Sequence, residues 1–314
     1  MIANPILSII IAVHNSADYI LTCLQSLEQA LDKDCRPECV EAIIVNDGST
    51  DNSLDIISNF PAKNFTKKVF SVNFHNVGKV KKFAFTHCQG EYITILDSDD
   101  ALKQNALTWL LEKVTEINFD LLITPIEEVR GELNLKNVEI NNNEKHIDKS
   151  SAKELYLNHK IIKGHIAGKF IRRSLLDNNM FPDLVCYEDI VTVAYAIHNA
   201  KKIIYSDTIC YQYRRRENSL SDDKYGEKIL LIFNAFDRIE PFFIENSTQR
   251  YLFEALLVKS ISDFISRTRS HKIPPYLTEK LVKINGINYL LCPKVRFSRK
   301  KMYLALKLRS ELAP

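Results

Sequence analysis

Two hydrophobic periods alternate along the first two thirds of the chain. Short apolar runs rich in β-branched residues predict buried strands, at 7–13, 40–46, 67–72, 91–96 and 119–124. Between them, apolar residues at helical spacing predict helices, at 16–30, 54–57, 79–88 and 109–117. Strands that alternate with helices are typical of a mainly parallel sheet with right-handed crossovers. We therefore expect an α/β fold.

The pattern changes twice further along the chain. Residues 127–149 are polar and Asn-rich, which predicts a loop rather than core. Order then returns, with helices expected at 151–159 and 189–199 and two short strands within 202–212. From Lys224 onward only helical stretches remain, at 227–239, 248–268 and 276–285. We place a boundary near residue 222, between an α/β domain at 1–222 and a helical region at 223–314.

Composition narrows the class of protein only a little. The 314 residues carry a formal charge of +3, which argues against a dedicated nucleic-acid binder. Seven thinly spread cysteines favour free thiols in a reducing compartment. No stretch of about 18 apolar residues and no cleavable leader is visible, so we expect a cytoplasmic protein.

Polar residues follow three of the predicted strands. They are His14 and Asn15, Asn46 and Asp47, and Asp97, Asp99 and Asp100. In open parallel sheets, ligands bind beyond the carboxyl ends of the strands. Asp97 and Asp99 are two positions apart, so an extended chain directs both to one side, where they favour Mg²⁺ or Mn²⁺ shared with a nucleotide diphosphate. Alternatively, these acids cap a helix starting near Leu102.

Six segments in order over about 215 residues carry a family resemblance. They are SIIIAVHN (8–15), IIVNDGSTDNS (43–53), GEYITILDSDD (90–100), GKFIRRSLL (168–176), YEDI (187–190) and YRRRENSLS (213–221). Together they resemble a family 2 glycosyltransferase of the GT-A fold. The resemblance implies an inverting, metal-dependent enzyme that moves one sugar from a UDP-sugar to an oligosaccharide or lipid-linked saccharide, in capsule, lipopolysaccharide or other surface-glycan synthesis.

The resemblance also implies donor-binding roles. The first strand end lies against the nucleotide, although Ala12 stands where Pro is usual and His14 where Tyr is usual. Asp47 accepts a hydrogen bond from uracil, and Gly48 permits the turn. Asp97 lies toward the ribose and, with Asp99, toward the Mn²⁺ or Mg²⁺ ion. The residues implied for donor binding at the strand ends are Ala12, Val13, His14, Asn15, Asp47, Asp97 and Ser98, to which Lys81, Lys82, Lys169, Arg214 and Arg216 are added from elsewhere in the chain.

On the acceptor side, the resemblance makes Asp189 the general base and Glu188 an orienting residue. An acid pair there could instead serve the N-terminus of a helix. Lys169 is expected near the acceptor, and Arg214 and Arg216 on a flap over the diphosphate or on a charged hairpin.

The stretch HNVGKVKK departs from the family, which usually has an Arg-Asn pair there. We expect Lys81 or Lys82 to meet phosphate, and Lys79 to lie on a solvated helix face.

The last stretch, 294–312, carries seven Lys or Arg and one Glu among apolar residues. Such a segment predicts either a basic amphipathic helix on the inner membrane surface or a helix packed on the preceding bundle. The oligomeric state is left open.

Two other functions compete with transfer. A sugar nucleotidyltransferase should have a glycine-rich basic signature after the first strand, which AVHNSADYI lacks. A silent sugar-nucleotide or glycan-binding module is disfavoured by the presence of both Asp99 and Asp189. A processive synthase should have a Gln-x-x-Arg-Trp motif, which is absent.

Overall fold

The computed structural model describes residues 5–32, 36–133, 135–141, 143–215, 227–268 and 272–311. The chain divides into two compact units, one formed by Met1–Lys149 with His165–Glu217 and the other by Ser150–Gly164 with Asn218–Pro314. The boundary predicted near residue 222 lies outside the described residues. Segment 150–164 groups with the helical unit, although it precedes the last strands of the α/β unit in sequence.

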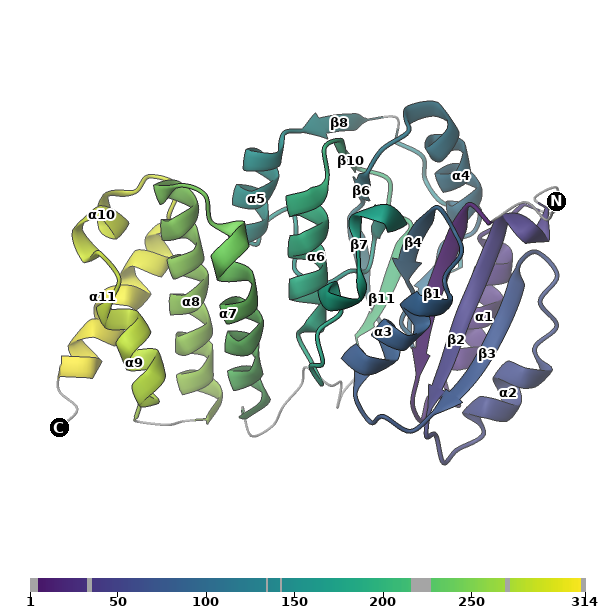
Figure 1. Cartoon of the computed structure of the whole chain (residues 1–314), viewed down its shortest axis with the longest axis horizontal. Coiled ribbons are helices and arrows are strands. Elements are labelled where there is room, and N and C mark those ends of the chain that lie inside the picture. Colours follow the sequence, from purple (N-terminus) through teal and green to yellow (C-terminus); the bar gives the residue numbers. More distant parts are fainter. Residues whose placement is uncertain are drawn as a thin grey trace. The chain divides into compact units, whose positions relative to one another are not determined.

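An eight-stranded sheet, in the order β3-β2-β1-β4-β9-β6-β10-β8, forms the centre of the first unit (Figure 1). The strands are β1 (Leu7–Val13), β2 (Val40–Asp47), β3 (Thr66–Val72), β4 (Tyr92–Ile95), β6 (Leu121–Ile123), β8 (Glu144–Ile147), β9 (Lys169–Arg172) and β10 (Ile203–Ser206). β1 pairs in parallel with β2 and β4, whereas β9 runs antiparallel to β4 and β6. The expected mixed, mainly parallel sheet is confirmed.

Helices cover this sheet on both faces. They are α1 (Ile20–Gln29), α2 (Ser53–Asn59), α3 (Val77–His87), α4 (Ala106–Ile117) and α6 (Glu188–Asn199). In Figure 1, α3 lies in front of the sheet and α1 behind it. Every residue of β2 is buried, and α1 buries Ile20, Leu24 and Leu27 at helical spacing. The continuous apolar runs therefore form doubly covered strands, as the sequence predicts.

A second, three-stranded sheet contains β5 (Ala101–Leu102), β11 (Tyr211–Arg215) and β7 (Ile126–Arg130). The loop predicted at 127–149 is therefore wrong, because it includes most of β7 and all of β8. Neither strand contains a buried residue. Their sequences are therefore polar and lack the apolar run that identifies a buried strand. The helix expected near Leu102 is also wrong, since Ala101 and Leu102 pair with β11 and α4 begins at Ala106.

The second unit is helical, as predicted. Its helices are α5 (Lys149–Leu157), α7 (Leu231–Phe243), α8 (Ser247–Thr268), α9 (Pro275–Val282), α10 (Gly286–Leu291) and α11 (Phe297–Glu311). The fully buried ammonium of Lys153 lies 2.6 Å from Glu245 and 5.0 Å from the centre of the Phe243 ring. Among the described helices, none is both long enough and apolar enough to cross a membrane.

Candidate functional site

The turn after β4 carries three carboxylates and is fixed by β11. Asp100 is 1% exposed and accepts hydrogen bonds from the Tyr211 hydroxyl (2.7 Å) and the backbone N–H of Arg214 (2.8 Å). The Tyr211 hydroxyl in turn accepts the backbone N–H of Asp97 at 3.1 Å. Asp100 therefore stabilises the turn itself, and Asp97 and Asp99 are presented on either side of the buried Ser98.

The electrostatics of this turn fit a cation. Burial, together with the negative charges of Asp97 and Asp99, raises the pKa of Asp100 to about 8. Within the described residues, however, no three His, Cys, Asp or Glu side chains gather as a metal-binding group. The donor set therefore fits an ion that takes one or two protein carboxylates and completes its shell with phosphate oxygens and water, as Mg²⁺ does.

Arg214 brings a positive charge to the same turn. Its Nε donates to the backbone carbonyl of Asp99 at 3.1 Å, and its guanidinium lies 5.3 Å from the centre of the Tyr19 ring. A guanidinium beside an acidic turn can meet a diphosphate there. Arg216, the other arginine expected on a flap, lies outside the described residues.

The ends of β1 and β2 are tied together. His14 Nδ1 lies 2.6 Å from the backbone carbonyl of Asp47 and therefore acts as the donor. Asn15, at a φ of 47°, accepts the backbone N–H of Thr50 on its side-chain oxygen at 2.8 Å. Ala12 and Val13 complete the end of β1, where Val13 is buried. These contacts hold the first strand end against the turn that follows β2.

Asp47 holds a neighbouring loop. Its carboxylate accepts the backbone N–H groups of residues 74, 75 and 76 at 2.5, 3.0 and 3.1 Å. The following Gly48 has a φ of +63°, and a Cβ there would lie 2.5 Å from Asn73 Oδ1, so the predicted glycine turn is present. Beside it, the buried Asn46 Oδ1 has no hydrogen-bond partner among the described residues.

A buried ion-pair network joins α3 to the start of α6. Lys81 is 3% exposed, and its ammonium lies 2.7 Å from Glu188 Oε1 and 2.9 Å from Asp189 Oδ1. The second oxygen of Asp189 accepts the backbone N–H of Ile166 at 3.1 Å. Both acidic residues of the YEDI segment are therefore held by protein groups, and the orientation of Asp189 is set from two sides.

A glycine allows this approach of α3. A Cβ at Gly78 would lie 2.0 Å from the carbonyl oxygen of Pro182 and within 3 Å of the Leu184 backbone. The backbone N–H of Gly78 also donates to the Leu184 carbonyl at 3.1 Å. The first turn of α3 thus lies directly against the loop before Glu188, and Lys81, one turn later, reaches the acids.

Lys81 determines the charges in this network. Burial raises the pKa of Glu188 to about 7, against the opposing effect of Lys81. Burial also acts to raise the pKa of Asp189, but the charge of Lys81 and two hydrogen bonds bring it below its ordinary value. The pKa of Lys81 itself is well above its usual range, because the charges of Asp189, Glu188 and Asp97 outweigh burial. Asp189 is therefore ionised at neutral pH.

The other predicted lysines take different positions. Lys169 is buried, and its ammonium donates to the carbonyl of His165 at 2.5 Å, in the turn that presents the Ile166 N–H to Asp189. Lys82 is half-buried, and Lys79 lies on an exposed face.

Three contacts of the site were not predicted from sequence: the Tyr211 bridge, the Ile166 N–H and the pairing of Lys81 with the acids. Tyr211 lies just before the predicted YRRRENSLS segment, but only the pairing of β11 with β5 brings it to Asp100.

An open, mainly parallel sheet with acids and a guanidinium at its strand ends is the arrangement expected of a glycosyltransferase of the GT-A fold. The glycosyl transferase family 2 profile matches residues 8–179, more than half of the chain. The chain belongs to this family.

Two curated relatives illustrate the range of the family. The chain is 28% identical over 72% of its length to the putative glycosyltransferase EpsH of Bacillus subtilis. It is 29% identical over 69% of its length to the poly(ribitol-phosphate) beta-N-acetylglucosaminyltransferase TarS of Staphylococcus aureus. The matches span 65% and 37% of those relatives, less than two thirds of either protein.

A solved structure supports the fold. The crystal structure of S. aureus TarS 1-349 in complex with UDP-GlcNAc superimposes with a TM-score of 0.65 and 20% identity, over 97% of this chain and 91% of that one. The GT-A assignment made from the sequence is confirmed.

Proposed function

We propose that this protein transfers a single sugar from a UDP-sugar to a hydroxyl of a saccharide or polyol-phosphate polymer of the bacterial surface, with inversion at the anomeric carbon. The observation that carries the proposal is the pair of sites in one unit: the acidic turn after β4, and a partly exposed carboxylate held by Lys81 and by the Ile166 N–H.

The donor is proposed to bind across the ends of β1, β2 and β4. The base and ribose would lie beside His14, Asn15 and Asp47, whose carboxylate also holds the backbone of residues 74–76, and the diphosphate would lie between Arg214 and the turn that contains Asp99. A divalent cation bound by Asp99, with help from Asp97, would supply Lewis-acid stabilisation of the departing diphosphate. The TarS structure with UDP-GlcNAc supports this class of donor.

Asp189 is proposed as the general base. Its carboxylate is ionised because Lys81 lies 2.9 Å away, and it can accept the proton of an acceptor hydroxyl. The hydroxyl oxygen then forms a bond to the anomeric carbon while the bond from that carbon to the diphosphate oxygen breaks. The products are the glycosylated acceptor, with inverted configuration, and UDP. In this scheme Lys81 and Glu188 position the base and do not contact phosphate.

The acceptor class rests on the relatives. TarS is described as acting on poly(ribitol-phosphate), and a second relative, from Bacillus spizizenii, is a poly(ribitol-phosphate) beta-glucosyltransferase, 31% identical over 66% of this chain. We extend to this chain only the coarse class, a surface polymer that presents hydroxyl groups.

A donor screen tests the proposal. The full chain with Mn²⁺ would be incubated with UDP-GlcNAc, UDP-glucose, UDP-galactose and GDP-mannose, and released nucleotide would be measured with and without poly(ribitol-phosphate) or oligosaccharide acceptors. We expect nucleotide release from one UDP-sugar, stimulated by acceptor. UDP binding without release across the whole panel would instead favour a silent binding module.

A further inference from the structure

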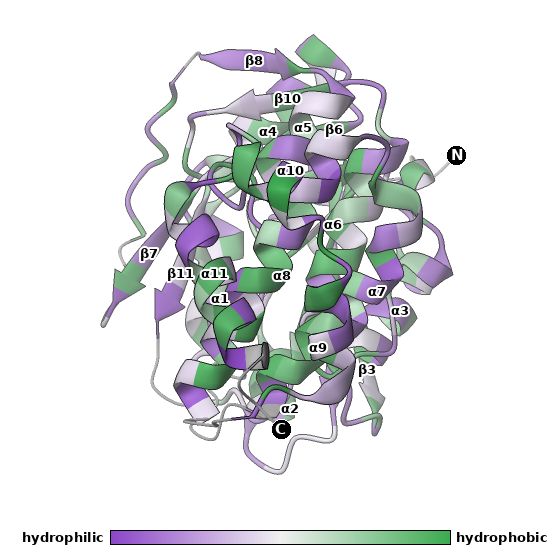
Figure 2. Cartoon of the chain, turned by 90° about the vertical axis from the view of Figure 1, so that its left-hand side faces the viewer, coloured by the Kyte–Doolittle hydropathy of each residue, from purple (hydrophilic) through white to green (hydrophobic). Residues whose placement is uncertain are grey.

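Exposed apolar side chains concentrate at the end of the helical unit. Among the described residues of this unit, most of the exposed large hydrophobic side chains lie on α9, α10 and α11. The most exposed are Ile287 (74%), Leu291 (75%), Phe297 (71%) and Leu308 (62%). Figure 2 shows hydrophobic and hydrophilic segments interspersed along these helices. Such a concentration differs from scattered single residues and indicates an interaction surface.

On α11 the exposed apolar residues form one stripe. With 3.6 residues per turn, Phe297, Leu304 and Leu308 fall within an arc of about 40°. Leu304 is 48% exposed. On the other side of the same helix, Tyr303 and Leu306 are buried at 4% and 5% exposure. One face of α11 therefore packs on the bundle, while a second apolar face points away from it.

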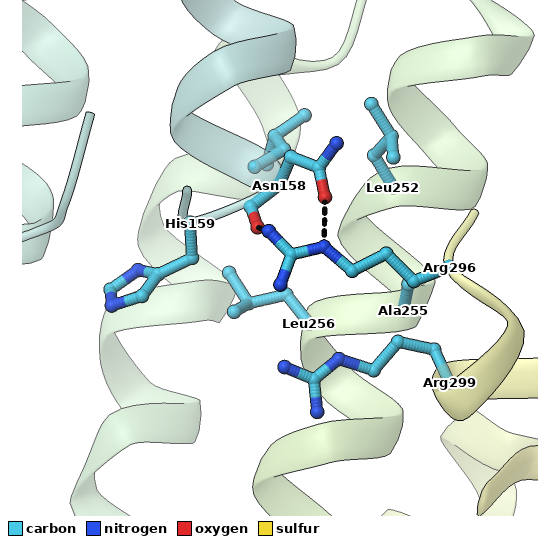
Figure 3. A pocket seen from close by; sticks show the side chains of 8 residues that line it. Asn158, His159, Leu252, Ala255, Leu256, Arg296 and Arg299 are labelled. Atoms are coloured by element: carbon cyan, nitrogen blue, oxygen red, sulfur yellow. Dashed lines mark hydrogen bonds between the residues drawn. The ribbon is translucent and has the colours of Figure 1, made fainter. Parts of the chain in front are cut away.

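Polar contacts fix which face packs. Arg296, at the start of α11, donates from Nε to Asn158 Oδ1 at 3.0 Å and from Nη2 to the Asn158 carbonyl at 2.9 Å. Figure 3 shows Arg296 and Arg299 directed into the same pocket beside α8. The ring of Tyr303 also lies 5.0 Å from that of Tyr289 on α10. The orientation of the exposed stripe is thus set by the packing of the helical unit itself.

Basic residues border this stripe. Lys301 falls beside it on an ideal helix, with its ammonium 4.8 Å from the centre of the Phe297 ring. On an ideal helix, Lys300 and Lys307 fall on one side of the stripe and Arg309 on the other. Residues 297–309 contain no Asp or Glu. An apolar stripe with cationic borders complements a surface that is apolar inside and anionic outside, such as the interface of an anionic bilayer.

We propose that the exposed face of α11 docks on an anionic lipid surface. Phe297, Leu304 and Leu308 enter the interface, and Lys300, Lys301 and Lys307 meet lipid phosphates. A second copy of the chain is a poorer occupant, because two such faces would bring like charges together. The proposal goes beyond the sugar transfer and does not depend on it.

Vesicle flotation tests the proposal directly. The full chain would be mixed with phosphatidylcholine vesicles with and without phosphatidylglycerol. We expect flotation only with the anionic lipid, weakening as salt is raised. Lys300→Gln and Lys301→Gln should each lower the partition coefficient about fivefold, because a basic residue near an anionic surface contributes about 1 kcal/mol. Combined Phe297→Ser, Leu304→Ser and Leu308→Ser should lower it at least about tenfold.

Leu21→Ser is the matched control, since Leu21 is 45% exposed but belongs to α1 of the α/β unit and should leave flotation unchanged. Circular dichroism would verify folding, and the single Lys variants provide a test even if the triple variant unfolds. Absence of flotation with phosphatidylglycerol overturns the proposal. So does a triple variant that floats normally, or one that changes only the molar mass in sedimentation, which would assign the face to a second copy.

Discussion

At the scale of single residues, the site depends on one buried cation. Lys81 pairs with both Glu188 and Asp189, so two acids share one buried counterion, while Asp189 itself stays partly exposed. Leaving a buried charge without its partner costs several kcal/mol, more than the pair itself contributes. The lysine predicted to meet phosphate therefore has a different main contact, and substitutions at this position should act through Asp189.

Replacing Lys81 tests this reading. In Lys81→Met the charge that lowers the pKa of Asp189 is lost, so burial raises that pKa and the base is protonated over more of the neutral range. The acid limb of the kcat/KM profile should move to higher pH, with turnover at pH 7 falling at least about tenfold. Lys81→Arg, which keeps the charge, should retain most activity. An unshifted pH profile in Lys81→Met, or an equal loss in both variants, would contradict the positioning role.

We expect the acids after β4 to have two different roles, metal binding for Asp99 and stabilisation of the turn for Asp100. Asp99→Ala should abolish transfer and the Mn²⁺-dependent part of UDP binding, with little change in stability, because Asp99 is only partly buried. Asp100→Ala should instead destabilise the fold by about 1–3 kcal/mol, since it leaves the Tyr211 hydroxyl and the Arg214 N–H without an acceptor. Calorimetry with UDP and thermal unfolding distinguish the two. Full Mn²⁺-dependent UDP binding by Asp99→Ala would remove the metal assignment.

At the scale of elements, the helical unit contains an acidic side chain, Glu254, whose partial burial disfavours its charged form. Glu254 on α8 has one carboxylate oxygen without a hydrogen-bond partner among the described residues. Burial, with a contribution from Glu240 against that of Arg250, raises its pKa to about 7. Between its ordinary value of 4.5 and this one, the folded chain keeps a proton that the unfolded chain has lost. Stability contributed by this group is therefore present at low pH and lost as pH rises toward 7.

Glu254→Gln should remove that loss. At about pH 7.5 the free energy of unfolding of the variant should exceed that of the unmutated chain by roughly 1–2 kcal/mol, once partial solvation of the carboxylate is allowed for. The variant should therefore unfold at a higher temperature. At about pH 4 the difference should nearly vanish, because below the ordinary value of 4.5 the Glu254 carboxyl is largely protonated in both the folded and the unfolded chain. Thermal melts at the two pH values measure it, and an equal effect at both would contradict the raised pKa.

Which elements could be predicted from sequence follows from how each is buried. β1 and β2 were located because doubly covered strands need continuous apolar runs, and α8 because its apolar positions recur over 22 residues. β7 and β8 were missed, since exposed edge strands such as IEEVR resemble loops. The sequence singles out Lys81 or Lys82 as a cation that meets phosphate, but the acids that Lys81 contacts are 107 and 108 positions away and only the packing of α3 reveals them.

At the scale of the whole molecule, the two units divide the proposed tasks. The α/β unit contains both the acidic turn and the held Asp189, so the chemistry is proposed to lie within one unit. The helical unit carries the basic apolar face of α11, so attachment to a surface is proposed for the other. Because 150–164 groups with the helical unit, the chain passes between the units more than once, and removing residues from 223 onward would leave α5 without its partners. Tests should therefore use the full chain.

The measurement that bears most directly on the central claim is turnover and donor affinity on a single variant, Asp189→Asn. Asn keeps the size of Asp189 and can still accept the Ile166 N–H, but it cannot take a proton from the acceptor. Turnover should fall by roughly 10²–10⁴ while affinity for the UDP-sugar changes little. Glu188→Gln, which alters the neighbouring acid of the same network, is the matched comparison and should lose less. Turnover by Asp189→Asn close to that of the unmutated chain would contradict the account, because a purely structural carboxylate at the start of α6 could be replaced by Asn without loss of catalysis.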